Sequence, residues 1–297
     1  MSTPIQKVCL VGANGSLGSV ILDALVAEGT FSVSVMLRAN STSTPAHAAV
    51  LTRIPIDPNF DGPELARLLV GQDAVVAAFP LKDVNQHLRL AEAAYKAGPA
   101  GPAPPAALPR QGRRAGAVRA ACGRRRGRRR ALYLDLDCLG PLLRLGPAQH
   151  YLHLDVAAKK ALILDAGVTK ASMSTLPRVA AAVVRVLQRQ DETRNRFVFV
   201  QSFCPTPLEV VAALERATGE PWHTAHVDSN AYLDRQAKAL EAGDEHALHN
   251  IVFVLGAVDA DWTRRDEFAM DLLGLEDENL DAVVGNTLNE MRAKGLA

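Results

Sequence analysis

The chain has 297 residues, 48% of them hydrophobic and 22% charged, with a formal net charge of +1. Length and composition indicate one large or two closely packed globular domains, and they exclude a fibrous, disordered or membrane-spanning chain. The sequence shows no secretory signal, and its four cysteines include no CxxC pair. We therefore expect a cytoplasmic protein with reduced thiols and no membrane partner.

The first hundred residues alternate between predicted strands and helices. Lys7 to Val11 is a predicted strand, and Ser16 to Glu28 carries apolar residues three and four apart, which is typical of an amphipathic helix that Gly29 ends. The alternation continues with strands at 31–37, 53–56 and 74–79 and helices at 62–69 and 84–97. This spacing predicts an α/β fold, namely a Rossmann-type doubly wound parallel sheet with helices on both faces.

The segment from Pro99 to Ala131 breaks this alternation. It contains only Ala, Pro, Gly, Arg, Leu, Val, Gln and Cys and has no helical or strand period. Ten arginines lie between 110 and 130, and without them the chain would have 23 basic against 32 acidic residues. As written, the segment indicates a disordered linker or a basic arm, although we consider nucleic acid an unfavoured partner.

The residue types of this segment offer a third interpretation. All eight have GC-rich codons, which a GC-rich gene yields when it is read in the wrong frame. Residues 133–146 (YLDLDCLGPLLRLG) can be back-translated and reread one base on as TWTWTALVHFFDWG, which reads like a strand followed by a pocket loop. We favour a frameshift or mis-spliced exon across 99–146, and we expect 99–149 to be a disordered or misfolded segment between 1–98 and 150–297.

Regular patterns resume near His150. Apolar periodicity predicts helices from Ser174 to Gln188 and from Pro207 to Thr218, with a strand from Arg196 to Val200 between them. From Trp222 onward the sequence is predicted to be mostly helical, with helices at 232–242, 245–254 and 281–294. We expect 150–297 to complete the Rossmann domain and to add a smaller, mostly helical C-terminal substrate region.

The motif that carries chemistry lies between the first strand and the first helix. Its residues are Gly12, Ala13, Asn14, Gly15, Ser16, Leu17 and Gly18. In this context Gly12 permits a tight turn, Gly15 lets the backbone approach a pyrophosphate, and Gly18 lets the helix pack closely. Free N–H groups and the positive end of the helix dipole attract phosphate, so we predict a dinucleotide site here.

The end of the second strand bears on the choice of coenzyme. Where NAD-preferring proteins often place an acid, this chain has Arg38 followed by Asn40 and Ser41. An arginine can hold a 2′-phosphate and Ser41 can add a hydrogen bond, so we predict NADP(H), with NAD(H) as the alternative. An exposed arginine without a ligand is the plain structural interpretation.

Two further patterns are ambiguous. Ala78, Phe79 and Pro80 end the fourth strand and should border the coenzyme, because ligands bind outside the carboxyl ends of parallel strands. Core packing explains Phe79 equally well. Three HxxH pairs, at 150/153, 223/226 and 246/249, lack an obvious third ligand and the inserted glutamate of HExxH, so we expect no metal site.

These segments resemble the NmrA-like and isoflavone-reductase-like family of atypical short-chain dehydrogenases. The similarity runs through KVCLVGANGSLG, VSVMLR, GQDAVVAAFP and AEAAYKAG, and it resumes at LHLDVAAKKALI and NRFVFVQSFCPTPLEVVAALERATG. It fails across 99–146, where the family has a fifth strand, a pocket loop and the catalytic lysine of its reductases. The resemblance therefore assigns no catalytic residue, and Lys159 and Lys160 do not inherit that role. A sheet lacking its fifth strand would expose the edge of the fourth.

The resemblance implies two candidate functions. The first is an NADP(H)-dependent oxidoreductase that transfers hydride to a small substrate, aromatic or conjugated in character. The alternative is a non-catalytic regulatory protein that senses NAD(P) and acts through a protein partner. A lysine or tyrosine positioned beside the nicotinamide would distinguish the two.

Overall fold

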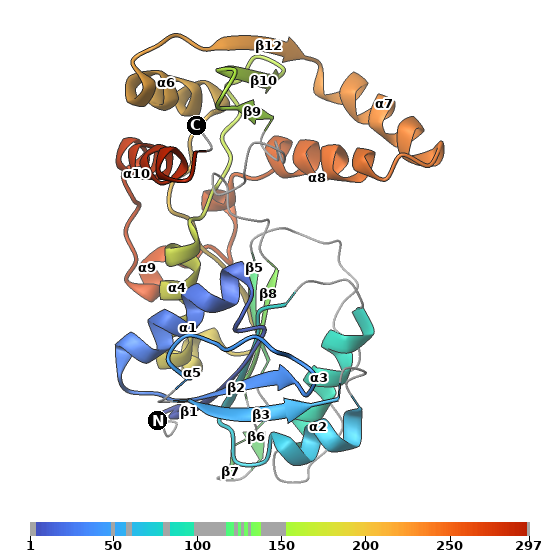
Figure 1. Ribbon diagram of the computed structural model, residues 1–297, viewed down its shortest axis with the longest axis vertical. Helices are drawn as coiled ribbons and strands as arrows, with labels where there is room; N and C mark the ends of the chain where they lie inside the picture. The colour runs from blue at the N-terminus through green and yellow to red at the C-terminus, as the bar shows by residue number, and fades with distance from the viewer. Residues whose placement is uncertain are drawn as a thin grey trace. The chain divides into compact units, whose positions relative to one another are not determined.

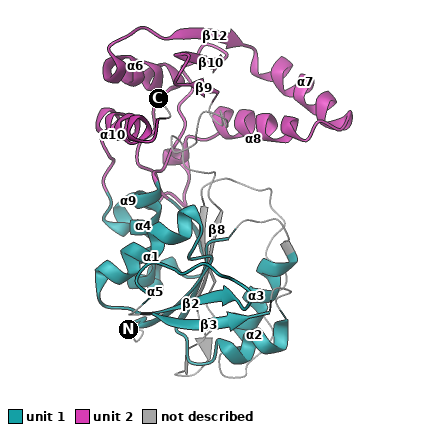
Figure 2. Ribbon diagram, in the orientation of Figure 1, with its two compact units in different colours: residues 1–138, 176–199, 269–275 teal, residues 139–175, 200–268, 276–297 magenta. Residues whose placement is uncertain are grey.

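The computed structural model describes residues 4–48, 51–57, 61–79, 84–97 and 153–295, together with the backbone of four strands between 117 and 137. The chain forms two compact units (Figure 2). Unit 1 comprises 1–138, 176–199 and 269–275, and unit 2 comprises 139–175, 200–268 and 276–297.

Unit 1 is built on a seven-stranded sheet. In spatial order its strands are β11 (Arg196–Phe199), β5 (Ala117–Ala121), β8 (Leu132–Asp137), β4 (Ala74–Ala77), β1 (Lys7–Val11), β2 (Ser32–Arg38) and β3 (Thr52–Ile56). The five strands from β8 to β3 are mutually parallel, whereas β5 runs antiparallel to both of its neighbours. The chain winds outward in both directions from β1, so the predicted doubly wound sheet is confirmed.

Helices cover both faces of this sheet. Figure 1 shows α1 (Ser16–Glu28) and α4 (Leu176–Gln188) on one face and α2 (Gly62–Leu68) and α3 (Val84–Ala97) on the other. Alternate residues of β1, Cys9 and Val11, join the apolar core beneath α2 and α3. Because both faces of β4 are covered, all four of its residues are buried, and β4 and most of β1 are apolar runs.

Two sequence-based expectations about this sheet are wrong. Strand β4 ends at Ala77, so Ala78 and Phe79 follow the strand and are not part of it. The edge of β4 is not exposed, because β8 pairs with it in parallel from Leu132 opposite Ala74 to Asp135 opposite Ala77. Strand β8 lies just beyond the Pro99 to Ala131 segment, and its sequence, LYLDLD, alternates apolar and polar residues as a strand does. The rest of 99–149 lies outside the described residues.

Unit 2 has a small sheet between two pairs of helices. Strand β10 (Lys160–Leu164) lies between β12 (His223–Val227) and the short β9 (Leu154–Asp155). Ala161 and Ile163 of β10 pack with α6 (Pro207–Thr218) and α10 (Leu280–Ala293). Leu164 packs instead with Tyr232 of α7 (Ser229–Glu241) and Val254 of α8 (His246–Val258). The alternation of β10 thus divides unit 2 into two cores.

The remaining short helices connect these elements. They are α5 (Gln190–Thr193), α9 (Met270–Leu273) and a 3-10 helix at Trp262–Arg264. Strand β12 was not predicted, because four of its five residues are exposed and show no apolar alternation. In the described part of the chain, no helix is long and apolar enough to span a bilayer.

A capping box starts α6 and gives a test of local stability. Thr206 accepts a hydrogen bond from Glu209 N–H at 3.2 Å, and the Glu209 carboxylate accepts one from Thr206 N–H at 2.7 Å. The hydrogen bond from the Thr206 backbone is the main cause that lowers the pKa of Glu209. The carboxylate form is therefore favoured by folding, and its contribution is lost as the pH falls through that lowered pKa.

We expect Thr206→Ala to lower the free energy of unfolding by about 1 kcal/mol at neutral pH. The difference from wild type should shrink in acid, because a protonated Glu209 no longer completes the box. Denaturation followed by circular dichroism at both pH values measures this. Thr44→Ala, at an exposed loop threonine, is the control. A deficit for Thr206→Ala that grows in acid would contradict this account of the cap.

Candidate functional site

The glycine motif forms a tight turn at the carboxyl end of β1. Gly12 lies in the left-handed region at φ +93°, and its carbonyl oxygen accepts a hydrogen bond from Gly15 N–H at 3.0 Å. A Cβ on Gly12 would stand 2.4 Å from the carbonyl oxygen of Ala78. A side chain is therefore excluded at Gly12 by both conformation and space.

Helix α1 approaches this turn very closely. A Cβ on Gly18 would lie 2.0 Å from the carbonyl oxygen of Gly12, which real structures do not tolerate. At Gly15 the corresponding distance is 3.3 Å, and the residue is exposed with an ordinary extended backbone. The protein's own packing thus requires glycine at positions 12 and 18. At position 15 the lack of a side chain instead leaves the exposed backbone of the turn uncovered.

The start of α1 has the features of an anion site. Gly15 is the N-cap and supplies no side-chain hydrogen bond, and the first turn contains no acidic residue. The first N–H groups of a helix have no acceptor within the helix, and the helix dipole is positive there. Asn14 and Ser16 are exposed and Leu17 is half-buried beside them, so this end of the helix is open to a phosphate-sized group.

Arg38 and Ser41 lie in one turn at the end of β2. Ser41 N–H donates to the carbonyl oxygen of Arg38 at 2.9 Å. Within the described part of the chain the Arg38 guanidinium has no hydrogen-bond acceptor or carboxylate partner, and the residue is exposed. The loop that follows is tied to α1, because His47 Nε2 lies 2.9 Å from a carboxylate oxygen of Asp23. Arg38 is thus an available cation at the carboxyl end of β2, on the same side of the sheet as the glycine turn that follows β1.

Ala78 and Phe79 form the opposite border of the turn. Ala78 N–H donates to the carbonyl oxygen of Val11 at 2.8 Å, which holds the Ala78 carbonyl over Gly12. The Phe79 ring stacks on His87 with centroids 3.9 Å apart, and it packs against the core beneath α2 and α3. Core packing therefore accounts for Phe79, and Ala78 contributes backbone alone. Pro80 lies outside the described residues.

The histidine pairs and lysines singled out in the sequence lie in other surroundings. His223 and His226 are three apart on β12 and so point to opposite faces, while His153 packs against the rings of Tyr232 and Phe253. Among the residues that the structure describes, no group of three His, Cys, Asp or Glu side chains could hold a metal ion. Lys159 forms an ion pair with Glu220 at 2.5 Å in unit 2.

Unit 2 contains a polar network that sequence reasoning missed. Ser172 Oγ donates to Gln201 at 2.9 Å and accepts from Trp262 N–H at 3.0 Å. Ser172 N–H also donates to the carbonyl oxygen of Ala260 at 2.7 Å. Three segments distant in sequence are thereby joined at one serine. No spacing rule could have found it, because each residue type is common and the segments meet only in the fold.

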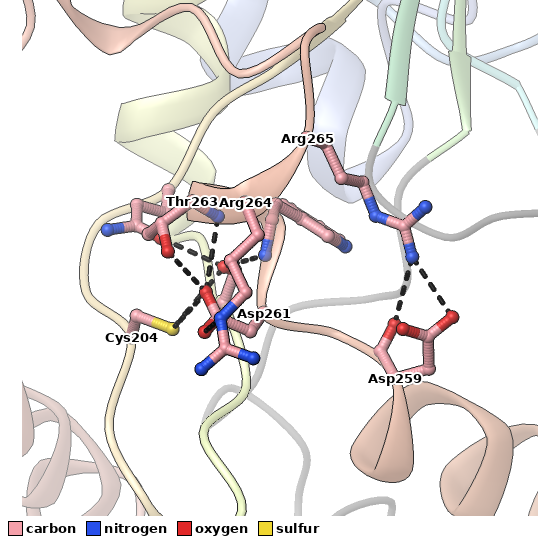
Figure 3. A network of polar contacts seen from close by, with 9 residues as sticks. Cys204, Asp259, Asp261, Thr263, Arg264 and Arg265 are labelled. Atoms are coloured by element: carbon pink, nitrogen blue, oxygen red, sulfur yellow. Dashed lines mark hydrogen bonds and ion pairs between the residues drawn. The ribbon is translucent and has the colours of Figure 1, made fainter.

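Asp261 is the charged centre of this network (Figure 3). Its carboxylate accepts hydrogen bonds from the hydroxyl and the N–H of Thr263 and from the Cys204 thiol, and Arg264 Nε lies 3.2 Å from it. The Thr263 hydroxyl is the main cause that lowers the pKa of Asp261, whereas burial raises the pKa of the Cys204 thiol. Asp261 is thus a stable anion, and Cys204 is a poor nucleophile at neutral pH.

A cavity of about 590 Å³ opens beside this network within unit 2. Its walls are 168–170 on one side and 258–261 with Arg264 and Arg265 on the other. The pairing of Ala171 with Ala260 holds these walls together. The cavity is within the size range of small-molecule sites.

The close approach of Gly18 to the turn can be tested by adding one methyl group. We expect Gly18→Ala to lower the free energy of unfolding by about 1–3 kcal/mol, because the carbonyl of Gly12 must move. Gly285→Ala in α10 is the matched control: nothing lies within 4 Å of its Cβ position, so it should stabilise by about 0.5–1 kcal/mol. Equal effects of the two substitutions in chemical denaturation would refute this description of the turn.

Comparison with known proteins finds a curated relative that is named an oxidoreductase. No protein-family model matches the chain. The oxidoreductase aprR of Aspergillus flavus is 26% identical over 298 residues, covering 95% of this chain and 98% of the relative. The alignment with aprR therefore spans nearly the whole of both proteins.

Solved structures give the fold. That of isoflavone reductase matches with a TM-score of 0.63 at 14% identity, over 96% of this chain and 99% of the other. That of AtPrR2 with NADP+ and (+)pinoresinol matches with a TM-score of 0.62 at 17% identity, over 97% and 100%. The chain thus has the fold of isoflavone reductase and a full-length relative among fungal oxidoreductases, and its resemblance to the NmrA-like and isoflavone-reductase-like family is confirmed.

Proposed function

We propose that the chain is an NADP(H)-dependent oxidoreductase that holds the coenzyme diphosphate at the Gly12 to Gly18 turn. The observation that carries the proposal is the open first turn of α1, where neither a side-chain cap nor an acidic residue competes with an anion. Gly12, Asn14, Gly15, Ser16, Leu17 and Gly18 would offer mainly backbone to the diphosphate. The lack of a Cβ on the exposed Gly15 would let phosphate oxygens reach the N–H groups.

Arg38 and Ser41 would distinguish the two nicotinamide coenzymes. The guanidinium would pair with the 2′-phosphate of NADP(H), and the Ser41 hydroxyl would add a hydrogen bond. An acid, which would accept from the ribose hydroxyls of NAD(H), is absent from 38–41. Ala78 and Phe79, which follow β4, would border the coenzyme mainly through their backbone, because the Phe79 ring stacks on His87 and packs against the core.

The reaction we propose is hydride transfer to a small aromatic or conjugated substrate. The coenzyme would supply the hydride, and the residues named above would bind and orient it. Support for turnover comes from aprR, a full-length relative that is named an oxidoreductase, and the chain shares its fold with AtPrR2, which was solved with NADP+ and (+)pinoresinol. The family resemblance places the catalytic lysine within 99–146, so none is assigned.

Coenzyme binding can be tested by titration of the purified chain. We expect NADPH to raise the melting temperature and to quench tryptophan fluorescence. Arg38→Gln should weaken NADPH binding about tenfold and leave NADH binding unchanged, because only NADPH carries the 2′-phosphate. Arg67→Gln, at an exposed arginine of α2, is the matched control.

Two results would overturn the proposal. One is wild-type protein that responds to neither NADPH nor NADH. The other is an equal loss of NADPH and NADH affinity in Arg38→Gln, which would remove the assigned role of the guanidinium.

A further inference from the structure

The cavity of unit 2 has a wall chemistry that the coenzyme site does not use. Its charged residues are Lys170, Arg264 and Arg265 against Asp259 and Asp261, which leaves one positive charge in excess. Val168 and Val258 also line it, and these side chains are 65% and 41% exposed. A cavity that combines exposed apolar surface with surplus positive charge suits a ligand with an apolar body and one acidic group.

Both carboxylates of the cavity are already neutralised. Asp259 accepts from Arg265 Nη2 at 3.0 Å, and Asp261 lies 3.2 Å from Arg264 Nε and accepts further hydrogen bonds from Thr263. An incoming anion would therefore meet little net repulsion from these two acids. Glu209 does not line the cavity, but its carboxylate, held by Thr206 in the capping box of α6, keeps its negative charge and interacts electrostatically with Lys170.

Two cationic side chains that line the cavity have hydrogen-bond donors that no described residue accepts. Within the described residues, Lys170 has neither a hydrogen-bond acceptor nor an ion-pair partner, and it is exposed. Arg265 uses Nη2 for Asp259, whereas its buried Nε has no acceptor among the described residues. A buried N–H without an acceptor is costly, and the exposed Lys170 ammonium can donate a charge-assisted hydrogen bond to a carboxylate oxygen.

The walls are held in place before any ligand binds. Ser172 N–H donates to Ala260, Ser172 Oγ accepts from Trp262 N–H, and both bonds are in the network behind the cavity. Lys170 lies two residues before this serine, and Arg265 lies three after Trp262. A site built on such fixed segments loses little freedom when the ligand binds.

We propose that this cavity binds an apolar organic acid, with Lys170 and Arg265 holding the carboxylate and Val168 and Val258 contacting the apolar body. A role for this acid as the hydride acceptor would rest on the proposed function. Binding itself does not, because every residue involved belongs to unit 2.

Calorimetry on the full chain tests the proposal with cinnamate and its neutral counterpart cinnamamide. Cinnamate should bind at least about tenfold more tightly, since a charge-assisted hydrogen bond is absent for the amide. Raising the salt concentration should weaken cinnamate binding alone. Equal binding of the two compounds, or binding of neither, would overturn the proposal.

Substitutions identify the groups that hold the acid. Lys170→Gln and Arg265→Gln should each weaken cinnamate binding about tenfold and leave cinnamamide unaffected. Lys238→Gln on α7 and Arg216→Gln on α6, exposed residues that do not line the cavity, are the matched controls. Unchanged cinnamate affinity in both cavity variants would also overturn the proposal.

NADPH titration of the same samples separates the two proposals. A chain that binds NADPH but does not discriminate cinnamate from cinnamamide would remove the acid site and leave the coenzyme assignment intact. A chain that binds cinnamate as predicted but no nicotinamide coenzyme would remove the coenzyme assignment and leave the acid site intact.

Discussion

The carbonyl oxygen of Gly12 fixes the geometry of the candidate coenzyme site. It accepts a hydrogen bond from Gly15 N–H, and it stands where a Cβ of Gly18 would otherwise lie. These two contacts fix the orientation of α1 relative to β1. The Ala78 carbonyl, which follows the neighbouring strand β4, packs against Gly12 from the other side. Because β1, β2 and β4 are parallel and in register, Arg38 comes to the same edge of the sheet.

Much of the fold could be predicted from the sequence, because its elements carry their own signals. The bounds of β1, α1, α3 and α6 agree residue for residue with the predicted ranges. Gly29 ends its helix in the left-handed conformation, as its position in the sequence predicted, and Gly219 ends α6 in the same way. The same local signals place the candidate coenzyme residues at the ends of β1, β2 and β4. Their roles in binding stay predictions.

The rest depends on contacts between distant segments. Strand β12 is exposed along most of its length and shows no apolar alternation, so it depends on its pairing with β10. The network at Ser172 and Asp261 joins residues up to 90 positions apart. Local periodicity carries no information about such partners, so the cavity of unit 2 could not be predicted. The frame hypothesis for 99–146 likewise stays a prediction.

The interleaving of the two units has a consequence for synthesis of the protein. The chain passes from one unit to the other after residues 138, 175, 199, 268 and 275. Helix α1 packs against α4, which the ribosome makes only after β10 of unit 2. A nascent chain must therefore keep an apolar helix face uncovered over much of its translation, and an arrested fragment would present that face to chaperones and proteases.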